Sequence, residues 1–166
     1  GSSQIIRDGF KQNFEIEYKT NSSNLVTEID KKSEELIINY VKKKYPKHGI
    51  LAEESGEKEL DSEYKWIIDP LDGTTNFAHG LPIFSDSIGV VKGKEIIAGV
   101  VYDVISDILY CAEKGSGAYR NGSKISVNKR DDIKTSLLVT GFPYDIKENP
   151  LNAVEHFNEF LYNSRA

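Results

Sequence analysis

The stretch WIIDPLDGTTNF at residues 66–77 constrains the fold most, because it sets an apolar run directly against a sharp bend. Pro70 fixes its own φ near about −65° and biases Asp69 toward an extended backbone. The strand is therefore expected to turn immediately after Ile68. Asp69 and Asp72 would then share one tight bend at the end of a buried strand.

Two acids on one bend repel each other, and a divalent cation between Asp69 and Asp72 would relieve that repulsion. Hard oxygen ligands, including a bend carbonyl such as that of Leu71, suit Mg²⁺. Gly73 lets the backbone approach a ligand closely, and residues 74–76 resemble the first turn of a helix, where backbone N–H groups attract an anion. Metal and phosphate are therefore expected to meet at this bend.

A surface turn is the alternative interpretation, because Asp-Pro and Asp-Gly are common turn dipeptides. A surface turn, however, requires neither the apolar residues 66–68 before it nor Thr-Thr-Asn-Phe after it. A second acidic element, Ala52-Glu53-Glu54-Ser55, also follows an apolar run, and adjacent acids at a strand end often form only a solvated loop. Together the two acidic elements favour a site over two unrelated loops.

The remaining pattern predicts an α+β fold, with helices packed on one antiparallel sheet. Residues 27–30 have the hydroxyl-then-acid spacing of a helix start, and Pro46 ends the helix that follows. Short buried strands are expected at 50–52 and 66–68. The later expected elements are hairpin strands at 87–91, 96–102, 108–112 and 118–119, two more strands at 125–127 and 136–140, and a closing helix at 150–162.

Composition limits the class of partner. The 166 residues carry 21 basic and 26 acidic side chains, a net charge of −5, and no basic block that would favour nucleic acid or a membrane surface. The single cysteine, Cys111, excludes an internal disulfide. No run approaches the roughly 18 apolar residues of a membrane span, and no signal peptide is visible, so the cytoplasm is the expected location.

Four segments carry a family resemblance: NLVTEID (24–30), LAEESG (51–56), WIIDPLDGTTNF (66–77) and GVVYD (99–103). They resemble the inositol monophosphatase family of Mg²⁺-dependent, lithium-sensitive phosphatases, and the resemblance runs from about Lys19 to Arg165. It implies that residues 1–166 form the N-terminal metal- and phosphate-binding domain, the first half of the family's layered αβαβα sandwich. It also implies a homodimer for the full-length protein.

The resemblance also assigns roles to single residues. The implied metal ligands are Glu53, Asp69, the Leu71 carbonyl and Asp72. The implied phosphate-binding residues are Asp72, Gly73, Thr74 and Thr75. Glu53 and Thr74 would position and activate the attacking water, with Asp30 hydrogen-bonded to Thr74. Lys19 matches the lysine of the family's mobile loop.

The chain also departs from the family pattern. Family members are longer, and their second half carries a W-D-x-x-A-G motif whose aspartate binds metal; these 166 residues contain no such motif. Asn24 stands where the family usually has Asp. Asp86 is expected to share a strand face with Phe84, Ile88 and Val90, where a carboxylate is costly unless it is partnered.

Other residues carry weaker signals for chemistry. His48, His79 and His156 lack metal-ligand spacing and are expected to be surface or capping residues, and Cys111 to be a small core residue. Residues 114–117 lack the lysine and hydroxyl residue of a phosphate-binding loop and predict a hairpin turn.

Three functional hypotheses remain open. The first is Mg²⁺-dependent hydrolysis of inositol monophosphate by metal-activated water. The second is a related phosphatase acting on fructose bisphosphate, a nucleotide phosphate or histidinol phosphate. The third is a truncated, non-catalytic domain that binds metal or protein.

Overall fold

A computed structural model describes residues 1–12, 16–18, 25–58, 61–143 and 145–164. These residues divide into two compact units, residues 1–125 and residues 126–166. Lys19 and Asn24, both singled out from the sequence, lie outside the described residues.

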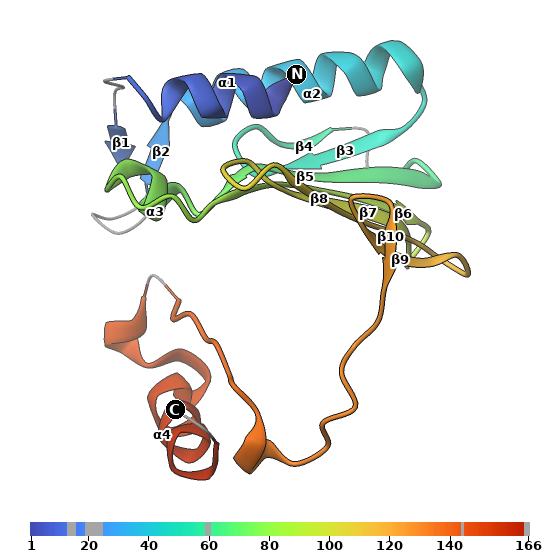
Figure 1. The fold of residues 1–166 in the computed structure, drawn as a ribbon. Helices are drawn as coiled ribbons and strands as arrows, with labels where there is room; N and C mark the ends of the chain where they lie inside the picture. Colours follow the sequence, from blue (N-terminus) through green and yellow to red (C-terminus); the bar gives the residue numbers. More distant parts are fainter. Residues whose placement is uncertain (13–15, 19–24, 59–60, 144, 165–166) are drawn as a thin grey trace. The chain divides into compact units, whose positions relative to one another are not determined.

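The first unit combines helices with an eight-stranded sheet and a small two-stranded one (Figure 1). Its elements are α1 (Ser2–Gly9), β1 (Ile16–Tyr18), β2 (Leu25–Thr27), α2 (Glu28–Lys44), β3 (Gly49–Ala52), β4 (Gly56–Lys58), β5 (Tyr64–Asp72), α3 (Thr74–Ala78), β6 (Ser85–Lys92), β7 (Glu95–Asp103), β8 (Ile108–Glu113), β9 (Gly117–Arg120) and β10 (Ser123–Ile125). This arrangement confirms the α+β class. Among the described residues, no helix is long and apolar enough to cross a membrane.

The large sheet is mixed, because one of its strand pairs is parallel. Its order is β10-β9-β8-β7-β6-β5-β3-β4, and β3 pairs with β5 in parallel while the other neighbours are antiparallel. β4 folds back on the outer edge of β3, so the chain must cross β3 before it adds β5 on the inner side. That crossing aligns the ends of β3 and β5 at one edge of the sheet.

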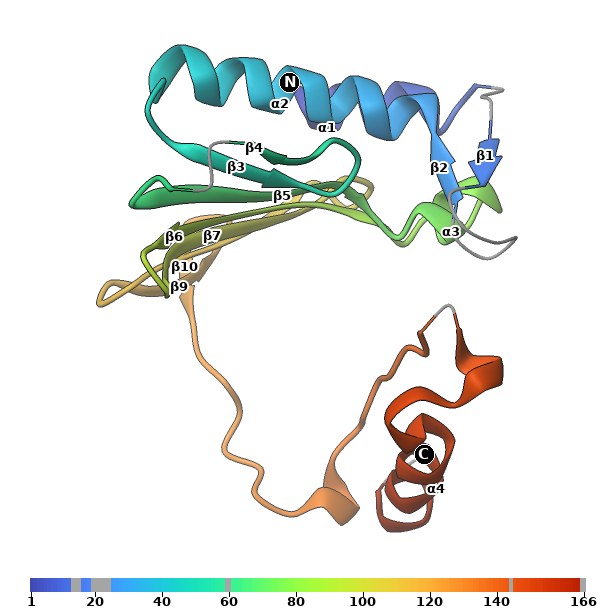
Figure 2. The same ribbon diagram turned by 180° about the vertical axis from the view of Figure 1, so that it is seen from behind.

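Helix α2 begins where the sequence predicts and for the expected reason. The Thr27 hydroxyl accepts hydrogen bonds from the N–H groups of Ile29 and Asp30, and the Asp30 carboxylate accepts one from the Thr27 N–H. This reciprocal capping box satisfies N–H groups that have no partner within the helix. Figures 1 and 2 show α1 and α2 along the same face of the sheet.

Two buried apolar clusters hold α2 and the bend in place. The first lies between α2 and the parallel strand pair and contains Ile37, Ile38, Val41, Ile50, Ala52 and Ile68. The second surrounds the bend and contains Ile6, Ile29, Leu71, Phe77, Phe84 and Val104. Each cluster includes a residue of β5, Ile68 in the first and Leu71 in the second, so close packing holds the acidic segment in place.

The second unit differs from the pattern expected for its residues. It contains three 3₁₀ turns (Ile133–Thr135, Ile146–Glu148 and Pro150–Asn152) and α4 (Ala153–Asn163). The strand expected at 136–140 does not form, and the strand expected at 125–127 is instead β10. The closing helix begins at Ala153, because Leu151 and Asn152 adopt positive φ and interrupt the helical turn that starts at Pro150.

Candidate functional site

The acidic bend is a bulge within β5 rather than the end of the strand. Asp69 pairs with Ser87 and Asp72 with Ser85, so three steps along β5 face two steps along β6. The strand therefore continues past Ile68, in contrast to the expected immediate turn. The extra residue re-aims the side chains locally, as bulges generally do. The Leu71 N–H donates to Asp69 Oδ1 at 3.2 Å, which closes a tight local turn around the two acids.

Gly73 is required by the geometry that follows the bulge. Its φ is +100°, and a Cβ added there would lie 3.0 Å from the carbonyl oxygen of Ile83 and 3.2 Å from the Cβ of Phe84. Both the conformation and the space exclude a larger side chain. The Gly73 carbonyl accepts the Phe77 N–H at 3.0 Å, so α3 starts directly after the acids.

Thr74 joins the bend to α2. Its Oγ1 lies 3.0 Å from Asp30 Oδ1 and 3.0 Å from the Leu71 carbonyl oxygen, and both Thr74 and Asp30 are buried. The other Asp30 oxygen accepts from the Thr27 N–H at 2.9 Å and from the Thr27 hydroxyl. Burial raises the pKa of Asp30, while these hydrogen bonds oppose the shift. The contact implied by the resemblance is thus present, and its catalytic role stays a prediction.

Glu53 and Asp69 lie side by side because of the parallel pair. Ala52 of β3 is in register with Ile68 of β5, so the next residue of each segment is an acid, and the Glu53 N–H donates to the Ile68 carbonyl at 3.0 Å. Burial is the main cause that raises the pKa of Asp69 to about 8. The charge of Glu53, a hydrogen bond with it and the charge of Asp72 add to that shift.

The donor set fits a hard cation by its chemistry. Glu53, Asp69 and Asp72 supply carboxylate oxygens, and the Leu71 carbonyl lies between the two aspartates in sequence. The charges of Glu53 and Asp72 add to the burial that raises the pKa of Asp69, and a cation would compensate those charges. Within the described part of the chain, however, no three acids, histidines or cysteines are gathered closely enough to form a ready-made cage. Exposed Glu53 and Asp72 would have to close around an ion.

Sequence reasoning missed Glu34, a buried acid on α2. Its two carboxylate oxygens accept the N–H groups of Glu54 and Ser55, at 2.7 and 2.9 Å. Glu34 is only 3% exposed. Its position four residues after Asp30, on the inward stripe of an amphipathic helix, is the signal that could have identified it.

Three residues outside the bend also have defined surroundings. Asp86 is buried; the Ser2 hydroxyl donates to its Oδ2, while its Oδ1 has no partner among the described residues. Burial raises the pKa of Asp86. His48 Nδ1 accepts the Trp66 indole N–H at 3.0 Å, and His79 Nδ1 lies 2.8 Å from the Thr75 carbonyl oxygen, which places both histidines in structural contacts.

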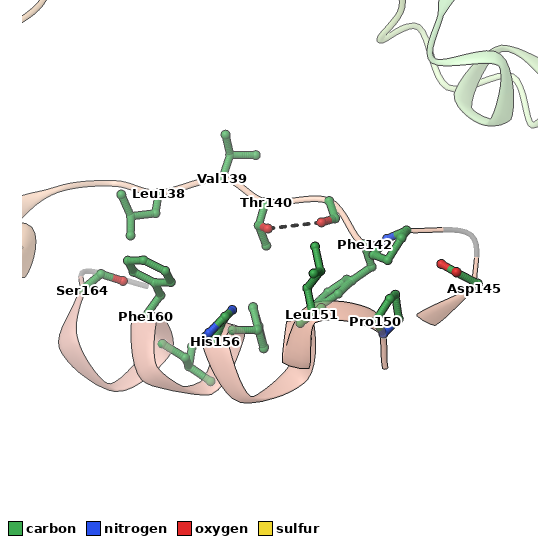
Figure 3. A pocket seen from close by; sticks show the side chains of 15 residues that line it. Leu138, Val139, Thr140, Phe142, Asp145, Pro150, Leu151, His156, Phe160 and Ser164 are labelled. Carbon is green, nitrogen blue, oxygen red and sulfur yellow. Dashed lines mark hydrogen bonds between the residues drawn. The ribbon is translucent and has the colours of Figure 1, made fainter. Parts of the chain in front are cut away.

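The second unit contains a pocket of about 850 Å³ that involves none of the predicted site residues. Figure 3 shows Leu138 from the extended segment facing Phe160 of α4, with His156 on the same helix. Its walls are mainly apolar, and the Phe142 and Phe157 rings lie edge to face at 5.3 Å. The pocket lacks the convergent acids of the bend and is not the candidate catalytic site.

Comparison with known proteins identifies relatives. The model of the inositol monophosphatase family matches residues 1–165. The chain is 44% identical over 141 residues to inositol monophosphatase 1 of Bos taurus, covering 82% of this chain and 51% of that protein. It is 46% identical over 143 residues to Nus factor SuhB of Pasteurella multocida (84% and 53%). A fructose-1,6-bisphosphatase/inositol-1-monophosphatase of Aquifex aeolicus is 42% identical over 144 residues (84% and 53%). The chain thus spans about half the length of these curated relatives.

Solved structures share the fold. The extragenic suppressor protein suhB of Bartonella henselae matches with a TM-score of 0.90 at 33% identity, covering 98% of this chain and 63% of that one. SaIMPase-II with bound inositol monophosphate matches with a TM-score of 0.76 at 31% identity (99% and 58%). The same protein with bound 2'AMP matches with a TM-score of 0.78 at 32% identity (99% and 60%).

Proposed function

Because the chain belongs to the inositol monophosphatase family, a family of phosphatases, we propose that its acidic bend forms the Mg²⁺ site for hydrolysis of a small phosphate monoester. Inositol monophosphate is the first candidate substrate. The observation that carries the proposal is the Thr74 hydroxyl, which lies 3.0 Å from Asp30 and belongs to the same bend as Asp69 and Asp72. A hydroxyl held by a buried carboxylate beside clustered acids suits activation of water.

The proposed metal ligands are Glu53, Asp69, the Leu71 carbonyl and Asp72. Bound Mg²⁺ would supply Lewis acidity, lower the pKa of a coordinated water and stabilise the leaving alkoxide. With only three acidic side chains in this set, the expected Mg²⁺ affinity of the 166-residue chain is weak.

The water is positioned by the chain's own groups. The Thr74 hydroxyl donates a hydrogen bond to Asp30 Oδ1, so the Thr74 oxygen can accept a hydrogen bond from the water. Glu53 accepts the second water proton. The water oxygen attacks phosphorus as the bond to the alcohol oxygen breaks, the alcohol oxygen takes up a proton from solvent water, and no phosphoenzyme is needed.

The phosphate is expected to meet backbone N–H groups after the bulge. Gly73, Thr74 and Thr75 enter the first turn of α3, where N–H groups have no partner within the helix. The absence of a side chain on Gly73 lets a ligand approach the backbone closely. Phosphate oxygens held there would lie beside Asp72.

The substrate class rests on relatives and remains open within the family. SaIMPase-II has been solved with inositol monophosphate and with 2'AMP, and the Aquifex relative is named for both fructose-1,6-bisphosphate and inositol-1-phosphate. A fructose-1,6-bisphosphatase or another sugar or nucleotide phosphatase is therefore the second candidate. A non-catalytic role is the third candidate, and one relative is named a Nus factor. Cytoplasmic location and a homodimer are also proposals.

Phosphate release tests the proposal. Inositol 1-phosphate, fructose 1,6-bisphosphate, 2'AMP and histidinol phosphate are supplied with Mg²⁺ or with EDTA, to the 166-residue chain and to any longer polypeptide that carries it. We expect Mg²⁺-dependent release from inositol 1-phosphate by the longer polypeptide and little by this chain. Release that is insensitive to EDTA would reject the metal mechanism, and Mg²⁺ binding without release from any substrate would favour the non-catalytic role.

A further inference from the structure

Glu34 holds the turn that carries Glu53. Both of its carboxylate oxygens are used, one by the Glu54 N–H at 2.7 Å and the other by the Ser55 N–H at 2.9 Å. These two donors follow Glu53 directly. A carboxylate accepts at both oxygens and donates at neither, so it matches two adjacent N–H groups better than any neutral side chain of its size.

The same helix face also holds the second acidic segment. Asp30 and Glu34 are four residues apart on α2, and Asp30 accepts the Thr74 hydroxyl just after the β5 bulge. One carboxylate thus fixes the turn after β3, and the other fixes the turn after β5. Residues four apart on a helix project from the same face, so their separation is set by the helix itself.

The helix is in turn anchored to the strands beneath it. Ile37, Ile38 and Val41 continue the inward stripe of α2 and pack in one cluster with Ile50, Ala52 and Ile68 of β3 and β5. The strand ends and the two carboxylates therefore belong to one packed assembly. A change at Glu34 would free the turn after β3 while leaving this apolar cluster intact.

We propose that Glu34 is a positioning residue for the metal site, which holds Glu53 beside Asp69 through the backbone of Glu54 and Ser55. The inference rests on the proposed function and deepens it. Glu34 does not touch the metal or the substrate; it sets where Glu53 stands when the acids close around an ion. Groups that hold metal ligands in place commonly change metal affinity or activity by about 10- to 100-fold when they are removed.

The test compares Glu34→Gln with Glu35→Gln in the 166-residue chain. Gln keeps the size of Glu34 but turns one acceptor into a donor that faces an N–H group, whereas Glu35 is an exposed glutamate on the same helix. Two NMR measurements are made: amide hydrogen exchange at residues 54 and 55 without metal, and a titration with Mg²⁺ alone. We expect faster exchange and about 10-fold weaker Mg²⁺ binding in Glu34→Gln, with both unchanged in Glu35→Gln.

Each other outcome has a separate meaning. Faster exchange at residues 54 and 55 with unchanged Mg²⁺ affinity would overturn the inference, because Glu34 would then serve stability alone. Absence of Mg²⁺ binding by the unaltered chain would reject the proposed function itself, and the inference with it. If Glu34→Gln does not fold, Glu34→Asp is measured in the same way; it keeps both acceptors but shortens their reach, so unchanged exchange and affinity there would also overturn the inference.

Discussion

The two carboxylates on α2 and the acids at the strand ends differ in what surrounds them. Asp30 and Glu34 are buried and receive hydrogen bonds from N–H and hydroxyl groups of the chain. Asp69 receives one from the Leu71 N–H and lies against the charges of Glu53 and Asp72. The fold thus supplies hydrogen-bond donors to the first pair, whereas the charges of the second set lie against one another and would be compensated by a cation or a proton. In the proposed site, Asp30 and Glu34 are acids of the first kind, which hold the turns, and Glu53, Asp69 and Asp72 are acids of the second kind, which are the proposed metal ligands.

The largest expected effect comes from removing an acid of the second kind. Asp69→Asn or Glu53→Gln should lower kcat by about 10²-fold or more in an active polypeptide, because each removes a group used in the transition state. Phosphate release under saturating substrate measures it, with the exposed Asp61→Asn as the control. Near-normal turnover in either variant would reject the assignment of that residue.

Replacing an acid of the first kind should act on folding as well as on rate. Asp30→Asn places an amide NH₂ group against the donors of Thr27 or Thr74, so the free energy of unfolding should fall by about 2 kcal/mol. Urea unfolding of the metal-free chain measures this loss. The same experiment on Asp69→Asn should show no such loss; equal losses in the two variants would remove the distinction between the two groups of acids.

The pH dependence of stability should separate the same groups. The raised pKa of Asp69, about 8, predicts that the metal-free folded protein keeps a proton on this group through neutral pH, whereas an unfolded Asp titrates near about 4. Stability from this group is therefore full below about pH 4 and declines as pH rises toward 8. Urea midpoints in EDTA should fall less over this window in Asp69→Asn than in the unaltered chain. An identical slope in both would show that Asp69 does not carry the proton.

Asp86 provides an intermediate case and the smallest expected effect. It is buried like Asp30, but one of its oxygens has no partner in the described part of the chain. Asp86→Asn should raise the free energy of unfolding by about 1 kcal/mol at pH 7, because the charged form no longer has to be buried. The gain should shrink toward pH 4, where burial keeps the folded carboxyl protonated and the unfolded carboxyl is already about half protonated. Thermal unfolding at the two pH values measures it, and a loss at pH 7 would reveal a compensating partner.

The sequence predicted the local features of the first unit well. The capping box at Thr27 and Asp30 forms, and the hairpins of β6 to β9 appear where turn residues separate β-prone segments. These features depend on neighbouring residues, so a local pattern can report them. The bend at Asp69 also forms, although as a bulge within a continuing strand, because the hydrogen bonds of β6 extend across it.

Features that depend on distant contacts were not predictable in the same way. The parallel pairing of β3 with β5 follows from where β4 folds back. Glu34 can accept the Glu54 N–H only because α2 lies across the turn after β3. Residues 136–140 have β-prone side chains, yet they form no strand, and Leu137 alone makes an isolated bridge. Long-range partners decided these elements, not local preference.

The contact between Trp66 and His48 gives the chain an intrinsic fluorescent probe of β5. Trp66 is the only tryptophan of the 166 residues, so the indole emission of the chain comes from a single place. That indole donates to His48 from β5, the strand that carries Asp69 three residues further on. A shift of β5 against the loop before β3 would alter the indole's hydrogen bond and its exposure to water. If the proposed ion binds at the bend and shifts β5, the emission of Trp66 would report it without a label.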